Sequence, residues 1–277
     1  MKTILFPTDF SPNATHAAQY AGLLASRLGA EVILLHIHSF PTVSAYQMPS
    51  EIENYVLQNR HQAEEDLRLA ATQFAQSAGL APERVRQIIE FGFVAEKITE
   101  TAKSTNADLI VMGTRGASNT LDRWLGTTAQ YVIKTAECPV WTVPQNALLN
   151  YPQKIMYAAD FKEDEVSAVQ KMLAIVEPLG ATCKVVHVHD YFAFNVEPDV
   201  DELMDDLKEE FANENVAFKT INRAEVIEGL ATYMKKEKPD VLALAIHEKS
   251  FLSNLFDSSV SKHFIQEGKL PMLTFKK

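Results

Sequence analysis

The sequence has little cysteine and no excess of positive charge. Its 277 residues include only Cys138 and Cys183, which are too few for a disulfide framework or a four-thiolate zinc site. The 26 Lys and Arg residues stand against 36 Asp and Glu, and this net charge of −10 disfavours nucleic acids and anionic membranes as partners. No apolar run approaches the roughly 20 residues of a membrane-spanning helix, and Pro7 interrupts the first apolar segment too early for a signal peptide. We therefore expect a cytosolic protein with reduced thiols.

Catalytic signatures are also missing from the sequence. There is no nucleophile elbow with a Ser-His-Asp order, no zinc signature and no kinase motif set. A Walker A motif is absent, and so is G-x-G-x-x-G, which disfavours dinucleotide binding. With 47% apolar and 22% charged residues, the chain has the ordinary balance of a globular protein. These features favour a binding protein over an enzyme.

The chain contains one pattern twice, and the second copy has a shorter middle. The repeat predicts two domains, at residues 1–147 and 152–277. The matching segments are Ile4–Phe10 with Ile155–Phe161, Leu34–His38 with Val185–His189, and Asp108–Met112 with Asp240–Leu244.

Within each copy, short apolar strands alternate with helical segments. In the first copy, Ser11 and Gly29 are a plausible N-cap and stop for a helix over Pro12–Leu28. The continuous apolar run Leu109–Gly113 is typical of a strand that is buried on both faces. Such alternation predicts an α/β fold with two tandem doubly wound (Rossmann-like) domains. Each would be a five-stranded parallel sheet with helices on both faces.

The glycine-rich segment after Leu109–Gly113 is the most informative part of the sequence. Its glycines and threonine follow the pattern G-x2-G-x9-G-T, at Gly113, Gly116, Gly126 and Thr127. A strand end, a glycine loop and a helix start together can cradle a phosphate with backbone N–H groups. The alternative interpretation is that these glycines only permit turns.

Four segments together resemble the universal stress protein family, in a tandem form. The resemblance covers the whole first copy and covers the second more weakly. The segments are Pro7-Thr8-Asp9, Leu35-His36-Ile37, the glycine pattern at Gly113, Gly116, Gly126 and Thr127, and Cys138-Pro139-Val140.

The resemblance implies ATP binding in the first copy. Asp9, with Pro7 and Thr8 beside it, would lie against the nucleoside. The backbone of Ile37 would form a hydrogen bond with the edge of the adenine ring. The ribose and phosphate side would be formed by Met112, Gly113, Arg115, Gly116, Gly126, Thr127 and Thr128, with Mg²⁺ as an accompanying ion; the family varies at Arg115. Family members pair through their last strands, here Val140–Val143 and Met272–Phe275. This implies intramolecular pairing of the domains and a homodimer of whole chains.

The second copy lacks the residues that could bind a phosphate in this loop. Ala245, Glu248 and Ser258 stand where the first copy has its three glycines, and Asp257 replaces Leu125. Because carboxylates repel phosphates, we predict that the second copy does not bind ATP. A different, non-anionic ligand is the alternative.

Histidines and carboxylates elsewhere favour structural or ligand-positioning roles. The pairs His36/His38 and His187/His189 lack a third metal ligand by spacing, so core or interface histidines are preferred over metal ligands. Asp9 has no partner base, which favours a ligand-positioning group over a catalytic acid.

Three functions follow from these observations. The first is a stress-response protein that binds ATP in its first copy and regulates or recruits an unidentified protein. The second is an interaction module with a vestigial pocket. The third is a slow ATPase, for which the sequence offers no general base.

Overall fold

The structure is a computed structural model of the chain. It describes residues 1–39, 49–115, 125–161, 164–190, 200–223, 225–246 and 270–277. The chain divides into two compact units, Met1–Gln145 and Asn146–Lys277, which are described separately. Among the described residues, no helix is both long and apolar enough to cross a membrane.

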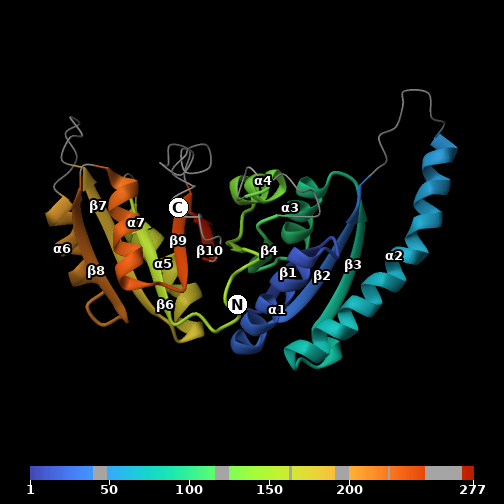
Figure 1. Cartoon of the computed structure of the whole chain (residues 1–277), viewed down its shortest axis with the longest axis horizontal. Helices are drawn as coiled ribbons and strands as arrows, with labels where there is room; N and C mark the ends of the chain where they lie inside the picture. Colours follow the sequence, from blue (N-terminus) through green and yellow to red (C-terminus); the bar gives the residue numbers. More distant parts are fainter. Residues whose placement is uncertain (40–48, 116–124, 162–163, 191–199, 224, 247–269) are drawn as a thin grey trace. The chain divides into compact units, whose positions relative to one another are not determined.

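The first unit is a parallel sheet with strand order β3-β2-β1-β4-β5. Figure 1 shows α1 and α2 on one face of this sheet and α3 and α4 on the other. The strands are β1 (Thr3–Thr8), β2 (Glu31–His38), β3 (Val85–Phe91), β4 (Leu109–Gly113) and β5 (Val140–Val143), and the helices are α1 (Pro12–Leu28), α2 (Pro49–Ala78), α3 (Val94–Ser104) and α4 (Thr127–Thr135).

Local sequence accounts for the bounds of these elements. α1 begins where the Ser11 hydroxyl accepts the Ala14 N–H at 3.2 Å, and it ends at Gly29, whose φ of 64° is left-handed. All but the last residue of β4 is buried, as its apolar run predicts. Burial of the large side chains in this core, Trp141 and Tyr20 among them, contributes about 1.5–3 kcal/mol for each.

The second unit repeats the first with the strand order β8-β7-β6-β9-β10, again parallel. α6 has 11 residues where α2 has 30, so the shorter middle of the second copy lies here. The predicted α/β fold with two tandem Rossmann-like domains is confirmed. The strands are β6 (Lys154–Ala159), β7 (Thr182–Asp190), β8 (Val216–Arg223), β9 (Val241–Ile246) and β10 (Met272–Lys276), and the helices are α5 (Glu165–Val176), α6 (Val200–Glu210) and α7 (Val226–Glu237).

Candidate functional site

The candidate site lies at the carboxyl ends of β1 and β4. These strands are neighbours in the sheet, and the connections from them run to opposite faces, which is where open α/β sheets bind ligands. In the register of these two strands, Leu5 pairs with Ile110. Continued along both strands, it sets Thr8 level with Gly113, so Asp9 follows β1 at the same edge.

The turn after β1 is held by hydrogen bonds between residues that are two positions apart in the sequence. Thr8 Oγ1 accepts the Phe10 N–H at 3.1 Å, and Asp9 Oδ1 accepts the Ser11 N–H at 3.0 Å. Phe10 has a φ of 59°, a left-handed conformation that costs a non-glycine residue about 1–2 kcal/mol. The strained turn directs the chain into α1 and holds the exposed Asp9 at the edge of the sheet.

His36 supports this turn from β2. Its Nδ1–H donates to the Thr8 carbonyl oxygen at 2.8 Å, and its ring stacks on Phe10 with the centroids 4.5 Å apart. His187 in the second unit makes the equivalent bond to the Ala159 carbonyl at 3.0 Å. Both histidines thus bind a backbone oxygen at the end of the neighbouring strand, the structural role preferred for them above.

The chain after β4 turns sharply toward α4. The Thr114 N–H donates to Val143 O at 3.1 Å, and the Gly126 N–H donates to Thr114 O at 2.7 Å. A Cβ on Gly113 would lie 3.2 Å from Arg115 O, and one on Gly126 would lie 3.3 Å from Thr114 O. A side chain at either position would therefore crowd the backbone of this turn, which agrees with the turn interpretation and is also compatible with anion binding.

The N-terminus of α4 offers N–H groups without a side-chain cap. Gly126 occupies the N-cap position and has no side chain to accept them, whereas Ser11 caps α1. The first-turn N–H groups of a helix carry partial positive charge. Thr127 and Thr128 add hydroxyl groups, of which that of Thr127 is on an exposed residue. This end of α4 can bind an anion.

Asn13 is a candidate that the sequence patterns do not indicate. It lies in the first turn of α1, and its carbonyl oxygen is 3.6 Å from the place of a Gly113 Cβ. Its side-chain Oδ1 is buried and has no hydrogen-bond partner among the described residues. A buried acceptor without a donor is costly. A ligand that donates a hydrogen bond here would remove that cost.

The other predicted site residues are distributed around the same edge. Ile37 is buried near the end of β2, Met112 is buried in β4, and the half-buried Arg115 follows Thr114. Gly116 lies outside the described residues, so its predicted role is untested. Within the described part of the chain, no group of three or more His, Cys, Asp or Glu residues could hold a metal ion.

Comparison with known proteins identifies the family. The sequence profile of the Universal stress protein family matches residues 1–144 and again residues 152–276. The chain belongs to the universal stress protein family. Universal stress protein G of Shigella flexneri is 28% identical over 144 residues, covering 51% of this chain and 98% of the relative. A universal stress protein of Thermus aquaticus is 35% identical over 142 residues, with 51% and 98% coverage.

A solved structure extends the likeness to the full chain. The universal stress protein from Archaeoglobus fulgidus aligns with a TM-score of 0.73 at 19% identity, covering 99% of this chain and 96% of that one. At this identity the match shows the fold, which is that of two universal stress protein units in tandem.

The second universal stress protein unit has a different group at the carboxyl end of its first strand. Asp160, the counterpart of Asp9, accepts a hydrogen bond from the Lys277 ammonium at 2.9 Å, and Glu165 Oε2 accepts another at 2.8 Å. The Lys277 and Glu165 side chains are only 3% and 5% exposed, so this is a buried ion pair.

Tyr157 completes the buried cluster of Asp160, Glu165 and Lys277. Its hydroxyl donates to Glu165 Oε1, and the Phe161 N–H donates to Glu165 Oε2 at 3.1 Å. Burial, followed by the charge of Glu165, raises the pKa of Tyr157 well above its usual range, so the phenol stays a donor. Burial lowers the pKa of Lys277, but the hydrogen bonds and charges of Glu165 and Asp160 outweigh it, and the net direction is upward. The lysine is therefore a cation at neutral pH.

The loop with Glu248, Asp257 and Ser258 lies outside the described residues.

Proposed function

We propose that the first unit binds ATP at the carboxyl ends of β1 and β4. The observation that carries the proposal is that Asp9 and the Gly113–Arg115 turn follow neighbouring strands at one edge of the sheet, where Thr114 O accepts the N–H of Gly126, the N-cap of α4. Family membership adds support, because both units match the universal stress protein profile. The protein would act as a cytosolic stress-response regulator whose state depends on the bound nucleotide.

The chemistry of the crevice suits a nucleoside with an anionic tail. Partial positive charge at the start of α4, together with first-turn N–H groups that the N-cap residue Gly126 has no side chain to cap, favours the phosphates. Asp9 accepts hydrogen bonds and therefore suits the ribose hydroxyl groups, while the β2 backbone near Ile37 suits the base. Mg²⁺ would enter with the nucleotide, because this ion is usually bound by substrate phosphates, waters and few protein ligands.

Binding rather than turnover fits the side chains at this edge. Asp9 Oδ1 already accepts the Ser11 N–H, and His36 uses its Nδ1–H on the Thr8 carbonyl. A general base must reach the proton that it abstracts. We therefore propose nucleotide-linked regulation of an unidentified protein partner, with a homodimer of whole chains as a further prediction that light scattering tests.

In the second unit, we propose that no ATP binds. The Lys277 ammonium is held by Asp160 and Glu165 at the end of β6, and the first unit has Gln145 at the position of this lysine. The carboxylates of Glu248 and Asp257 in the following sequence would repel phosphates.

The amount of nucleotide per chain tests the proposal directly. Protein purified without added nucleotide is denatured, and the released nucleotide is quantified by chromatography before and after incubation with Mg-ATP. We expect one ATP per chain. Two per chain would contradict the proposal for the second unit. None after incubation would favour an interaction module with a vestigial pocket, and release of ADP with time would favour a slow ATPase.

A further inference from the structure

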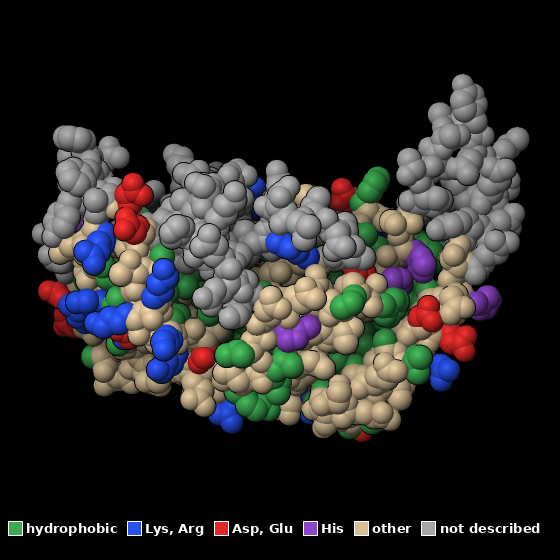
Figure 2. All heavy atoms as spheres, in the orientation of Figure 1, with side chains coloured by type: hydrophobic (Ala, Val, Ile, Leu, Met, Phe, Trp, Pro, Cys, Tyr) green, Lys and Arg blue, Asp and Glu red, His purple; other side chains and the backbone are tan. Residues whose placement is uncertain are grey.

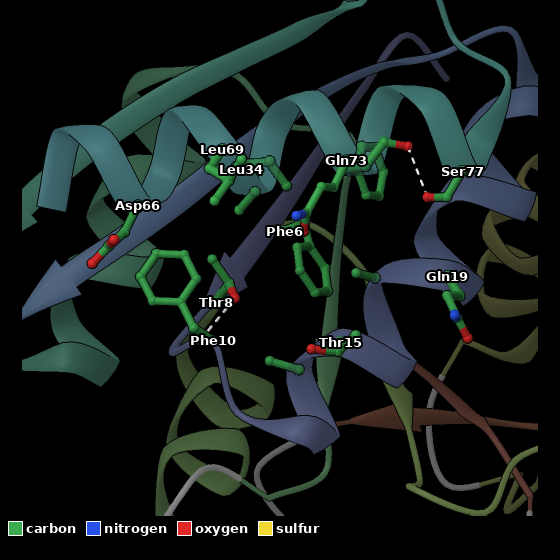
Figure 3. Close-up of a pocket in the computed structure, with 14 residues that line it drawn as sticks. Phe6, Thr8, Phe10, Thr15, Gln19, Leu34, Asp66, Leu69, Gln73 and Ser77 are labelled. Atoms are coloured by element: carbon green, nitrogen blue, oxygen red, sulfur yellow. Dashed lines mark hydrogen bonds between the residues drawn. The ribbon is translucent and has the colours of Figure 1, made fainter.

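The first unit contains a second cavity, between α1 and α2 over β1 and β2. Figure 3 shows it with Phe6 and Leu34 of the sheet at its floor and the two helices as its walls. Its volume of about 480 Å³ is within the range of small-molecule pockets. Its lining comes from β1, β2, α1, α2 and the turn after β1, and includes no residue of β4 or α4. It is therefore separate from the start of α4, although Thr8 borders both.

Small side chains on the two helices leave this space open. Ala14 and Ala18 on α1 and Ala70 on α2 all line it. The repeat gives an internal comparison, because Glu165 and Val169 stand in the second unit where the first has Ala14 and Ala18. Both larger side chains are buried there, with 6% and 0% exposure. The counterparts of two of the small cavity-lining residues are thus larger, buried side chains in the second unit.

Aromatic and aliphatic groups dominate the cavity and reach its rim. Phe6 and Phe74 lie with ring centroids 6.4 Å apart and an angle of 16° between their planes. Phe10 and Leu69 at the rim are 37% and 57% exposed, so the apolar lining continues to the surface. A ligand with a flat apolar body would cover these groups and bury them.

The charge of the lining selects the head group of the ligand. Asp66 is the charged residue of the described lining, and in Figure 3 it lies at the same end of the cavity as Phe10. Among the described residues, no Lys or Arg lines the cavity. On the face shown in Figure 2, Lys and Arg side chains gather over the second unit, while the first presents mainly hydrophobic, neutral polar, histidine and acidic side chains. Among the described lining residues an anion would meet no opposite charge, whereas a cation would meet the Asp66 carboxylate.

The nearby His38 does not compete for the carboxylate at neutral pH. Burial, followed by the neighbouring His36, lowers the pKa of His38, although Asp66 acts in the opposite direction. Gln62 Nε2 donates to Asp66 Oδ1 at 2.9 Å, which orients the carboxylate without neutralising its charge.

We propose that the cavity between α1 and α2 binds a small aromatic amine, with its ring among Phe6, Phe10 and Phe74 and its ammonium group against Asp66. The ring is recognised by apolar contact and stacking, and the ammonium by a charge-assisted hydrogen bond next to an aromatic face. The proposal does not depend on ATP binding, because the two sites use different parts of the unit.

A titration with three probes of similar shape and different charge tests the head group. Full-length protein with labelled Ala and Leu methyl groups is titrated by NMR with tryptamine, with its neutral analogue tryptophol, and with the anion indole-3-propionate. For a ligand of this size we expect tryptamine to bind with a Kd of about 1 mM and to shift the methyl signals of Leu69 and Ala18. Tryptophol should bind about 5-fold more weakly, and the anion more weakly still.

Two pairs of variants locate the binding site. Asp66→Asn should weaken tryptamine about 5-fold and leave tryptophol unchanged, while Glu65→Gln, one residue away on exposed helix surface, should change neither. Ala18→Leu, which places a larger side chain in the cavity, should abolish binding of both probes, while Ser26→Leu on the exposed surface of α1 should not.

Four results would overturn the proposal. They are equal affinity for tryptamine and tryptophol, equal effects of Asp66→Asn and Glu65→Gln, displacement of the amine by saturating Mg-ATP, and shifts of the Leu69 methyl with protein concentration alone. The third would place the amine in the nucleotide crevice. The fourth would assign the groove to a second copy of the chain.

Discussion

The Lys277 ammonium lies 2.9 Å from Asp160 Oδ1, and this contact joins residues 117 positions apart within the second unit. The equivalent aspartate of the first unit, Asp9, is exposed, and Gln145 corresponds there to Lys277. The difference between Gln145 and Lys277, each of which follows the last strand of its unit, therefore changes the charge beside the aspartate that follows the first strand. The two units share a fold but present different groups at the same edge.

Replacing Lys277 by Met should destabilise the second unit. The change leaves Glu165, 5% exposed, as a buried carboxylate without its cation, and breaking a buried pair in this way typically costs about 3–5 kcal/mol. Denaturant unfolding followed by circular dichroism measures the loss. Lys276→Met is the matched control, because Lys276 is exposed, and it should change the free energy of unfolding by less than about 0.5 kcal/mol. Equal effects of the two variants would show that the buried ion pair contributes nothing.

A carboxylate at position 127 should separate phosphate binding from helix stability. Thr127→Glu places a negative charge in the first turn of α4, which favours the helix by about 0.3–1 kcal/mol but repels phosphates. We expect the affinity for ATP, measured by calorimetry, to fall at least about tenfold while the melting temperature holds or rises. Thr127→Gln has a similar size without charge and should keep the affinity within about threefold. A tight ATP complex of Thr127→Glu would place the phosphates elsewhere.

The sequence predicted the elements whose signals are local. Ser11 and Gly29 mark the ends of α1 because caps act over three or four residues, and the apolar run of β4 reports its own burial. The repeat, visible as matching strands, predicted that one fold occurs twice.

The features that the sequence did not predict depend on contacts between residues far apart in the chain, or on a cavity that small side chains leave. Lys277 and Asp160 meet only because β10 and β6 lie in one sheet, and Asn13 approaches Gly113 only when α1 packs beside β4. The cavity at Ala14 and Ala18 results from small side chains, which read as ordinary helix residues in a sequence. Its one available signal was the comparison of copies, in which Ala14 corresponds to Glu165.

The two thiols should be unreactive in the folded protein. Burial raises the pKa of the Cys138 thiol to about 11 and that of the Cys183 thiol to about 12. At pH 8 a thiol with a pKa of 11 is only about 0.1% thiolate, the form that alkylates. Iodoacetamide should therefore label Cys138 about a hundredfold more slowly than in urea, with a rate that rises with pH up to about 11. Mass spectrometry after timed quenching measures both rates, and rapid labelling at pH 7.5 would indicate an activated cysteine.

Asn13→Ala should weaken ATP binding without weakening the unliganded protein. The Asn13 Oδ1 is a buried acceptor that has no partner among the described residues, so removing it sacrifices no hydrogen bond in the absence of ligand. The free energy of unfolding without nucleotide should stay unchanged or rise by up to about 1 kcal/mol, part of which reflects the better helix propensity of Ala. Ser26→Ala, on the exposed surface of the same helix, measures that propensity contribution by itself.

With ATP present the two alanine variants should diverge. If a ligand hydroxyl or amine donates to Asn13 Oδ1, its loss costs about 0.5–1.5 kcal/mol, which is a 2- to 13-fold weaker complex. Ser26→Ala should keep the original affinity. A loss of unliganded stability in Asn13→Ala, with ATP affinity unchanged, would mean that the amide supports the start of α1 and takes no part in binding the nucleotide. Because the same variant is measured with and without ATP, the structural and the ligand-binding roles of Asn13 predict opposite pairs of results.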